Sequence, residues 1–166
     1  MKLIGVALIV ASAGWVGIGM SVSLKKRMEL YQTAMQALQL LKNEIAFCGT
    51  ALPQAFGLLA ASCEGMLALV FSSAGRRMDR CPWISPAEAM RQAVSCLEDH
   101  QLKNIFLRLG QGLGNYGLDA QIQAIHAARD QIARLLETLD ATRKEKSKVY
   151  ETMGICVGLS VAILLI

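Results

Sequence analysis

The side chains that could do chemistry are few in this chain of 166 residues, and they lie far apart in the sequence. The two histidines, His100 and His126, belong to no metal-binding pattern such as His-Glu-x-x-His. Zinc sites and disulfide frameworks need close, regular cysteine spacing, and no Cys-x-x-Cys pair is present. We therefore expect no metal site and no cofactor. We interpret the cysteines as small buried or half-buried thiols in a reducing compartment: Cys48, Cys63, Cys81, Cys96 and Cys156.

Two glutamates, Glu44 and Glu64, lie among apolar residues and are the candidate functional carboxylates. A carboxylate in such surroundings can serve a functional site, but it more often caps a neighbouring helix or accepts a backbone hydrogen bond. The periodicity does not bring the two onto one helix face, and no nucleophile elbow or phosphate loop is present. The residues therefore predict no catalytic site, and we interpret the chain as a non-enzymatic binding protein.

A glycine-rich stretch and an arginine-rich stretch each have the composition of an anion site. Leu109 to Gln121 is glycine-rich, but no Lys-Ser or Lys-Thr follows it and no strand precedes it. A tight corner between helices, with positive φ and close backbone contact, explains these glycines better. Gly75 to Trp83 holds three arginines, yet the interspersed Asp79 favours a solvated loop over a phosphate site. We expect no nucleic-acid partner and no small-molecule substrate.

The first half of the chain predicts helices. Hydrophobic residues make up 54% and aromatic residues only 5% of the chain, which favours helix over strand. An amphipathic helix stops at Gly49 and restarts after Leu52-Pro53; its apolar stripe is Met28, Tyr31, Met35, Leu38, Leu41 and Ile45. Leu52 to Ala74 is predicted as two short buried helices hinged near Cys63-Glu64-Gly65. A third membrane segment is the alternative, and a lone carboxylate at mid-membrane counts against it.

The second half predicts further helices. Ser85-Pro86-Ala87-Glu88 has the residues of a capping box, and the helix that it opens is predicted to end near Asp99-His100. A short helix follows, with Leu102, Ile105, Phe106 and Leu109 on one side. The longest helix is predicted from Asp119 to Tyr150, leading into the apolar C-terminus; its stripe is Ile122, Ile125, Ala128, Ile132, Leu135, Leu136 and Leu139.

Both ends of the chain are apolar. Leu3 to Leu24 lacks charge and, as a helix, rises ~33 Å before Lys25-Lys26-Arg27, enough to cross a bilayer. A cleaved signal peptide is the alternative, but the apolar run continues well past Ala11-Ser12-Ala13. Met153 to Ile166 rises only ~21 Å, so full crossing and shallow insertion both stay open. Cations on the inner flank of each segment place the middle of the chain in the cytoplasm.

These patterns together predict an all-α protein. Residues 1–24 are expected to form an N-terminal transmembrane anchor, 25–150 a cytoplasmic bundle of about five or six helices, and 151–166 a short C-terminal transmembrane or membrane-inserted helix. Ala13-x-x-x-Gly17 and Gly154-x-x-x-Gly158 have the small-residue spacing that lets two membrane helices approach closely.

An apolar anchor that ends in cations is followed along the chain by a series of short motifs: Ala37-Leu38-Gln39, Glu44-Ile45, Gly49-Thr50, Leu52, Leu109-Gly110, Leu113-Gly114, Gln121, Ile125, and Met153-Gly154-x-x-x-Gly158-Leu159. In this order and spacing, over nearly the whole chain, the sequence resembles the stage III sporulation protein AB family of endospore-forming bacteria. The chain departs from the family pattern at Phe47, Ala51 and Gly117, where the family usually has an aromatic hydroxyl, a proline and an acid. A basic residue expected near Gln123 is also missing.

The resemblance implies a cytoplasmic helical domain similar to the inner-membrane platform protein of type II secretion and type IV pilus systems. It implies a non-enzymatic platform or adaptor subunit of the secretion-like complex between mother cell and forespore, in the mother-cell membrane around the forespore. A hexameric secretion-type ATPase and other membrane subunits are the implied partners. We expect partner binding at a linked corner formed by Glu44, Thr50, Leu113, Gly114 and Gln121. The alternative hypothesis is a small holin-like pore-forming membrane protein.

Overall fold

The computed structural model describes the backbone of residues 2–114 and 117–165 and the side chains of residues 23–114 and 117–142. Within these ranges every regular element is a helix, and the all-α class predicted from the sequence is confirmed. The chain divides into two compact units, one made of Met1–Met28 and Leu136–Ile166 and the other of Glu29–Leu135. The second is called the helical domain below.

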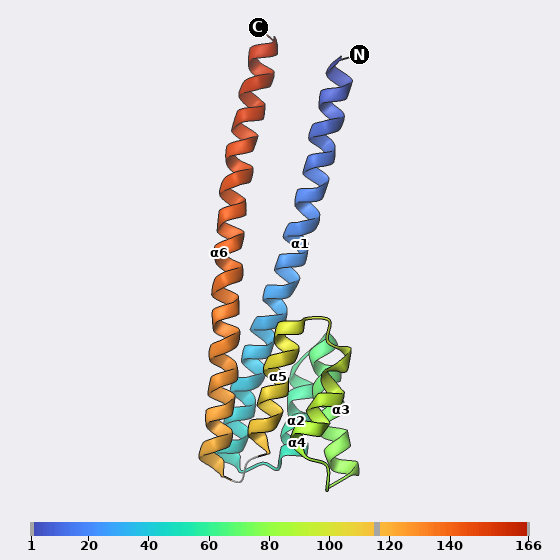
Figure 1. Ribbon diagram of the computed structural model, residues 1–166, viewed down its shortest axis with the longest axis vertical. Coiled ribbons are helices and arrows are strands. Elements are labelled where there is room, and N and C mark those ends of the chain that lie inside the picture. Colours follow the sequence, from blue (N-terminus) through green and yellow to red (C-terminus); the bar gives the residue numbers. More distant parts are fainter. Residues whose placement is uncertain (1, 115–116, 166) are drawn as a thin grey trace. The chain divides into compact units, whose positions relative to one another are not determined.

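Six α-helices are present in the described residues (Figure 1). A π-helical turn follows the first helix at Glu44–Cys48, and a 3-10 turn follows the fourth at Val94–Cys96. The α-helices are α1 (Lys2–Asn43), α2 (Leu52–Ser62), α3 (Gly65–Arg80), α4 (Pro86–Ala93), α5 (His100–Leu113) and α6 (Leu118–Leu165).

The first unit contains the two ends of the chain. Its backbone is helical in both segments, and α6 continues without a break from its first turns to Leu165, as the sequence predicts. The membrane segments predicted at 1–24 and 151–166 fall almost entirely outside the residues whose side chains are described, as do the paired glycine motifs. Among the described residues, no helix combines the length and the apolarity that a membrane crossing requires.

The helical domain alternates the direction of its helices. The connections from α1 to α2, from α3 to α4 and from α5 to α6 therefore come to the same end of the domain, the lower end in Figure 1. We call this the loop end and define it by residues 44–51, 81–85, 113–114 and 117–121. The connections α2–α3 and α4–α5 lie at the opposite end.

The core of the helical domain is built from the stripes that the periodicity predicts. Phe56, Phe71 and Phe106 come from α2, α3 and α5 and are all buried. Phe71 stacks on Phe56 with ring centroids 6.0 Å apart and meets Phe106 edge-on at 5.6 Å. Such offset and edge-to-face pairs add to the burial of apolar area. The other large side chains with almost no exposure are Tyr31, Leu38, Leu41, Leu59, Leu67, Met90, Leu102, Leu109 and Leu113.

One predicted loop is wrong. The segment beginning at Gly75 continues α3 as far as Arg80, and only the residues after it form a connection. Ala74 and Met78 extend the buried stripe across the arginines at helical spacing, and a Cβ on Gly75 would lie 3.1 Å from the Pro53 carbonyl oxygen. Burial against α2 therefore outweighs the loop-forming composition.

The start of α4 is largely as predicted. Ser85 Oγ accepts a hydrogen bond from the backbone N–H of Glu88 at 3.2 Å, and Pro86 takes the first helical position. The Glu88 carboxylate accepts two hydrogen bonds from Arg91, at 2.8 and 2.9 Å. Arg91, and after it Gln92, holds the pKa of the Glu88 carboxyl below its usual value. The helix ends at Ala93, earlier than the predicted end near Asp99.

Asp99 joins α5 to α1. Its carboxylate caps α5 by accepting from the N–H groups of Gln101 and Leu102, each at 3.0 Å, and it accepts the Tyr31 hydroxyl at 2.9 Å.

We expect Asp99→Ala to lower the free energy of unfolding by about 1.5 kcal/mol, because it removes a helix cap and leaves the hydroxyl of the buried Tyr31 with one acceptor fewer. Urea titration would measure this loss. Tyr31→Phe should cost less, and the two losses should not add, since both remove the same bond. Additive losses would contradict the coupling.

Candidate functional site

The break after α1 is a wide helical turn closed by Glu44 and Thr50. Gly49 adopts φ 62°, a left-handed conformation that glycine takes without strain, and its N–H bonds the Glu44 carbonyl oxygen. The Thr50 backbone N–H bonds the same oxygen at 3.1 Å. The Thr50 hydroxyl donates to Glu44 Oε2 at 2.8 Å. Two of the predicted site residues are thus joined through both backbone and side chain.

Leu113 and Gln121 form a second pair at the loop end. The Gln121 side-chain amide donates to the Leu113 carbonyl oxygen at 3.3 Å, and the Gln121 backbone N–H donates to the Gly117 carbonyl oxygen at 3.2 Å. Leu113 is the buried last residue of α5, and Gly114 is the exposed residue that caps the helix. Gln121 therefore fastens the first turn of α6 to the last turn of α5.

The predicted corner between helices in the glycine-rich stretch is present, but its glycines have different roles. Gly117 alone of the four has positive φ, at 147°. Gly110 and Gly112 lie inside α5 and permit close packing: a Cβ on Gly110 would be 2.8 Å from Met90 Cβ, and one on Gly112 would collide with Ala124 of α6. The composition of this stretch predicts that small residues are required, but it does not show which glycines form a turn and which allow two helices to pack closely.

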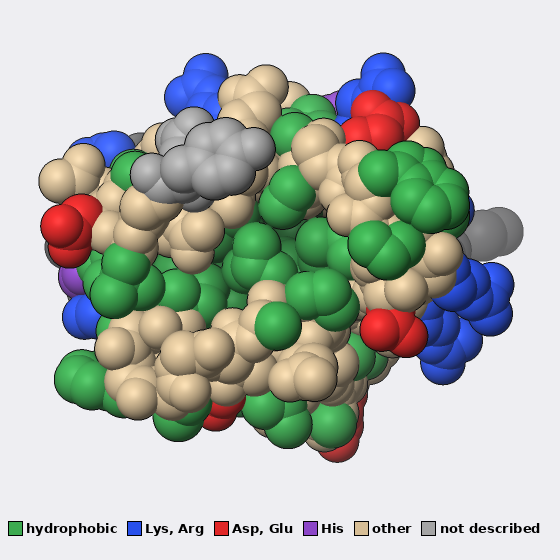
Figure 2. All heavy atoms as spheres, turned by 90° about the horizontal axis from the view of Figure 1, so that it is seen from below, with side chains coloured by type: hydrophobic (Ala, Val, Ile, Leu, Met, Phe, Trp, Pro, Cys, Tyr) green, Lys and Arg blue, Asp and Glu red, His purple; other side chains and the backbone are tan. Residues whose placement is uncertain are grey.

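Three large apolar side chains are exposed at the loop end. Phe47 is 82% exposed, Trp83 is 85% exposed and Leu118 is 48% exposed. Phe47 lies between α1 and α2, Trp83 lies between α3 and α4, and Leu118 is the first residue of α6. Figure 2 looks onto this end and shows hydrophobic side chains gathered at its hollowed centre, with the charged side chains mostly around the rim. We call Phe47, Trp83 and Leu118 the apolar trio.

Sequence reasoning missed the apolar trio. The available signal was a large apolar residue outside any helical stripe, as Trp83 is beside Pro82, and Phe47 beside the Gly49 break. That signal does not show that the three connections lie at the same end of the domain, because this follows only from the alternating helix directions (Figure 1).

The other candidate groups are Glu64 and the cysteines. The prediction of buried or half-buried thiols is wrong for Cys48 and Cys96, which are exposed. Glu64 is exposed at the start of α3, in place of the apolar setting expected for it. Cys63 is buried, and burial raises the pKa of its thiol, so the thiol stays protonated near neutral pH. Within the described part of the chain, no group of three or more His, Cys, Asp and Glu side chains could hold a metal ion.

Comparison with known proteins identifies a related fold and a protein family. No curated protein matches the chain. A solved structure of stage III sporulation protein AB superimposes with a TM-score of 0.64 at 18% sequence identity, covering 70% of this chain and 94% of that one, so the two share a fold. The sequence profile of the family described as stage III sporulation protein AB matches residues 2–166. With its helical domain and nearly its whole length accounted for, the chain belongs to the stage III sporulation protein AB family.

Proposed function

We propose that this chain is a non-enzymatic membrane platform subunit of a secretion-like sporulation complex, and that its loop end docks a cytoplasmic secretion-type ATPase. The observation that carries the proposal is the apolar trio, three exposed large side chains brought to one end by three separate connections. Membership in the stage III sporulation protein AB family supports the proposal that the complex is a sporulation complex.

The chemistry of the loop end suits a protein partner. Large apolar side chains that are exposed to water often mark a protein interaction site. Aromatic residues are also enriched among those that contribute most of the binding energy at protein interfaces. Phe47 and Trp83 have the size and exposure for that role. The Glu44–Thr50 and Leu113–Gln121 pairs fix the backbone that carries two of the three members of the trio. A partner would therefore meet a surface already in its binding conformation.

The position of the loop end also suits docking. Glu29 to Asn43 rises ~21 Å along α1, so the loop end lies well away from the end of the domain at which Glu29 stands. We place membrane segments at 1–24 and 151–166, and residues 25–150, which include the helical domain, in the mother-cell cytoplasm. A soluble ATPase in the same compartment could then bind the loop end.

Truncation at this surface should separate function from folding. We expect Trp83→Ala to lower ATPase affinity at least tenfold, as for a central aromatic contact, and to reduce sporulation. Glu44→Ala and Gln121→Ala should reduce sporulation more mildly. The thermal melt of Trp83→Ala should stay nearly unchanged, because the side chain is exposed.

Leu58→Ala is the matched control, since Leu58 is an exposed apolar residue on α2, outside the loop end. It should sporulate normally. If Glu44→Ala and Gln121→Ala unfold the domain, or if Leu58→Ala impairs sporulation as much as Trp83→Ala, the docking proposal fails.

A further inference from the structure

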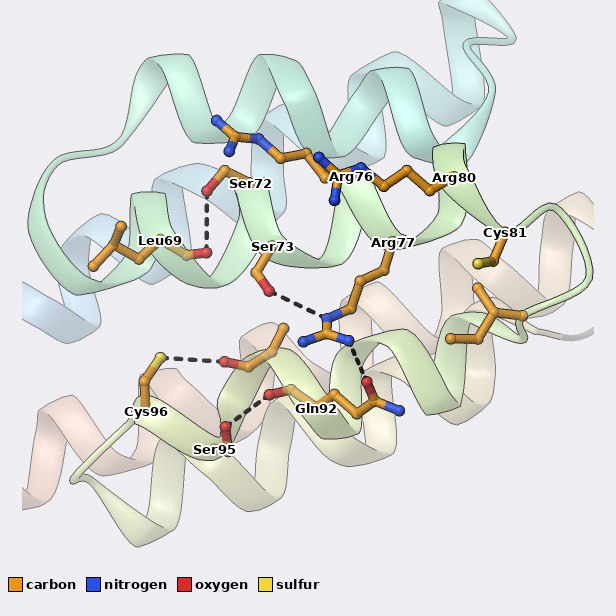
Figure 3. Close-up of a pocket in the computed structure, with 12 residues that line it drawn as sticks. Leu69, Ser72, Ser73, Arg76, Arg77, Arg80, Cys81, Gln92, Ser95 and Cys96 are labelled. Carbon is orange, nitrogen blue, oxygen red and sulfur yellow. Dashed lines mark hydrogen bonds between the residues drawn. The ribbon is translucent and has the colours of Figure 1, made fainter.

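A groove of about 660 Å³ runs between α3 and the α4 segment. Figure 3 shows its lining, with Cys81 at one end and Leu69 and Cys96 at the other. The α3 wall is a single stripe at helical spacing: Leu69, Ser72, Ser73, Arg76, Arg77 and Arg80. Leu69 to Arg80 rises ~16 Å, which equals three turns of an α-helix. The groove shares Cys81 and Ile84 with the loop end, but it contains none of the residues of the two polar pairs there.

Three arginines line the groove, but only Arg77 extends across toward α4 in Figure 3, whereas Arg76 and Arg80 lie along α3 at the rim. Arg77 points toward α4 and is held there, because its guanidinium donates to Gln92 Oε1 and to Ser73 Oγ. Arg76 and Arg80 are exposed, and within the described part of the chain neither has a carboxylate at ion-pair distance. The groove therefore offers positive charge that no carboxylate in the described part of the chain neutralises.

The rest of the lining limits what this charge can bind. Leu69 and Ile84 give the groove accessible apolar surface between its polar groups, and the almost fully buried Ala93 also lines it. None of the lining residues is aromatic, whereas single-stranded nucleic acid is usually held by stacking on aromatic rings. A lipid bilayer presents a flat array of headgroups, which does not enter a concave space between two helices. An elongated ligand with both acidic and apolar side chains fits the lining best.

We propose that the α3–α4 groove binds an acidic amphipathic helix of a partner protein, with carboxylates on Arg76 and Arg80 and an apolar edge on Leu69 and Ile84. Arginine suits this role because its planar guanidinium pairs with a carboxylate through two parallel hydrogen bonds. About three turns of the partner helix fill the length of the groove. This site adds a second binding surface and does not depend on ATPase docking at the loop end.

The test uses the full chain in nanodiscs of zwitterionic lipid and a fluorescein-labelled, helix-forming peptide with a leucine stripe flanked by glutamates. We expect saturable binding that weakens as salt rises. The same peptide with glutamine for each glutamate should bind at least tenfold more weakly. Arg76→Gln/Arg80→Gln should also weaken binding of the acidic peptide about tenfold.

The control variant is Arg91→Gln/Arg108→Gln, which makes the same change in net charge at exposed arginines outside the groove. It should change affinity no more than twofold. Equal losses in both double variants, no saturable binding of the acidic peptide, or preferential binding of phosphatidylglycerol vesicles or single-stranded RNA would each overturn the proposal. Trp83→Ala should leave peptide binding intact, so failure here is distinguishable from failure of the loop-end docking.

Discussion

Phe71→Ala is expected to lower the free energy of unfolding of the helical domain by about 3–5 kcal/mol. Phe71 has no solvent exposure, and its ring contacts Phe56 on one side and Phe106 on the other. Removing the ring deletes both aromatic contacts and leaves a cavity where α2, α3 and α5 meet, which close-packed neighbours fill only in part. Urea titration followed by far-ultraviolet circular dichroism measures the loss.

Phe47→Ala is the matched control, because it removes the same ring from a site that is mostly in water. Its free energy of unfolding should stay within about 0.5 kcal/mol of the parent chain. A loss at Phe47 comparable to that at Phe71 would mean that Phe47 is part of the fold, and the apolar trio would lose a member.

Gly110→Ala is expected to lower the free energy of unfolding by about 2.5 kcal/mol, within the range for overpacked cores. The added methyl group would lie 2.8 Å from Met90 Cβ and 3.2 Å from both the Ala87 Cα and the Pro86 carbonyl oxygen. Two of these three atoms belong to backbone, so α4 and α5 would have to move apart. Chemical denaturation again gives the value.

Gly57→Ala makes the same chemical change in a different setting. Gly57 lies inside α2, and nothing stands within 4 Å of an added Cβ. Alanine there should raise the free energy of unfolding by about 0.5–1 kcal/mol through its better helix propensity. Opposite signs for Gly57→Ala and Gly110→Ala are the expected result. Stabilisation by both would show that α4 and α5 are not in close contact at Gly110.

The sequence predicts most of the helices because their apolar residues recur at one spacing. The break at Gly49, the restart at Leu52 and the cap at Ser85 all carry local signals, and the structure has them. The segment after Gly75 is the exception, since its composition indicates a loop and its packing against α2 makes it helix. Local composition could not reveal that contact, because the partner residues lie on another helix.

The candidate site is predictable in part. The sequence analysis predicted one linked corner of Glu44, Thr50, Leu113, Gly114 and Gln121. Hydrogen bonds join Glu44 to Thr50 and Gln121 to Leu113, and partner binding at these residues stays a prediction. The apolar trio and the arginine groove depend on how separate helices pack, so no local pattern contains them. Arg76 and Arg80 illustrate this, because they read as loop residues in the sequence and become one wall of a groove once α3 extends through them.

Site-specific photocrosslinking in sporulating cells tests the central claim most directly. A photoreactive residue placed at Gln121, at the loop end, should capture the secretion-type ATPase, whereas the same residue placed at Leu58 on α2 should not. Capture of the ATPase from Leu58 but not from Gln121, or capture of only other proteins from Gln121, would contradict the account.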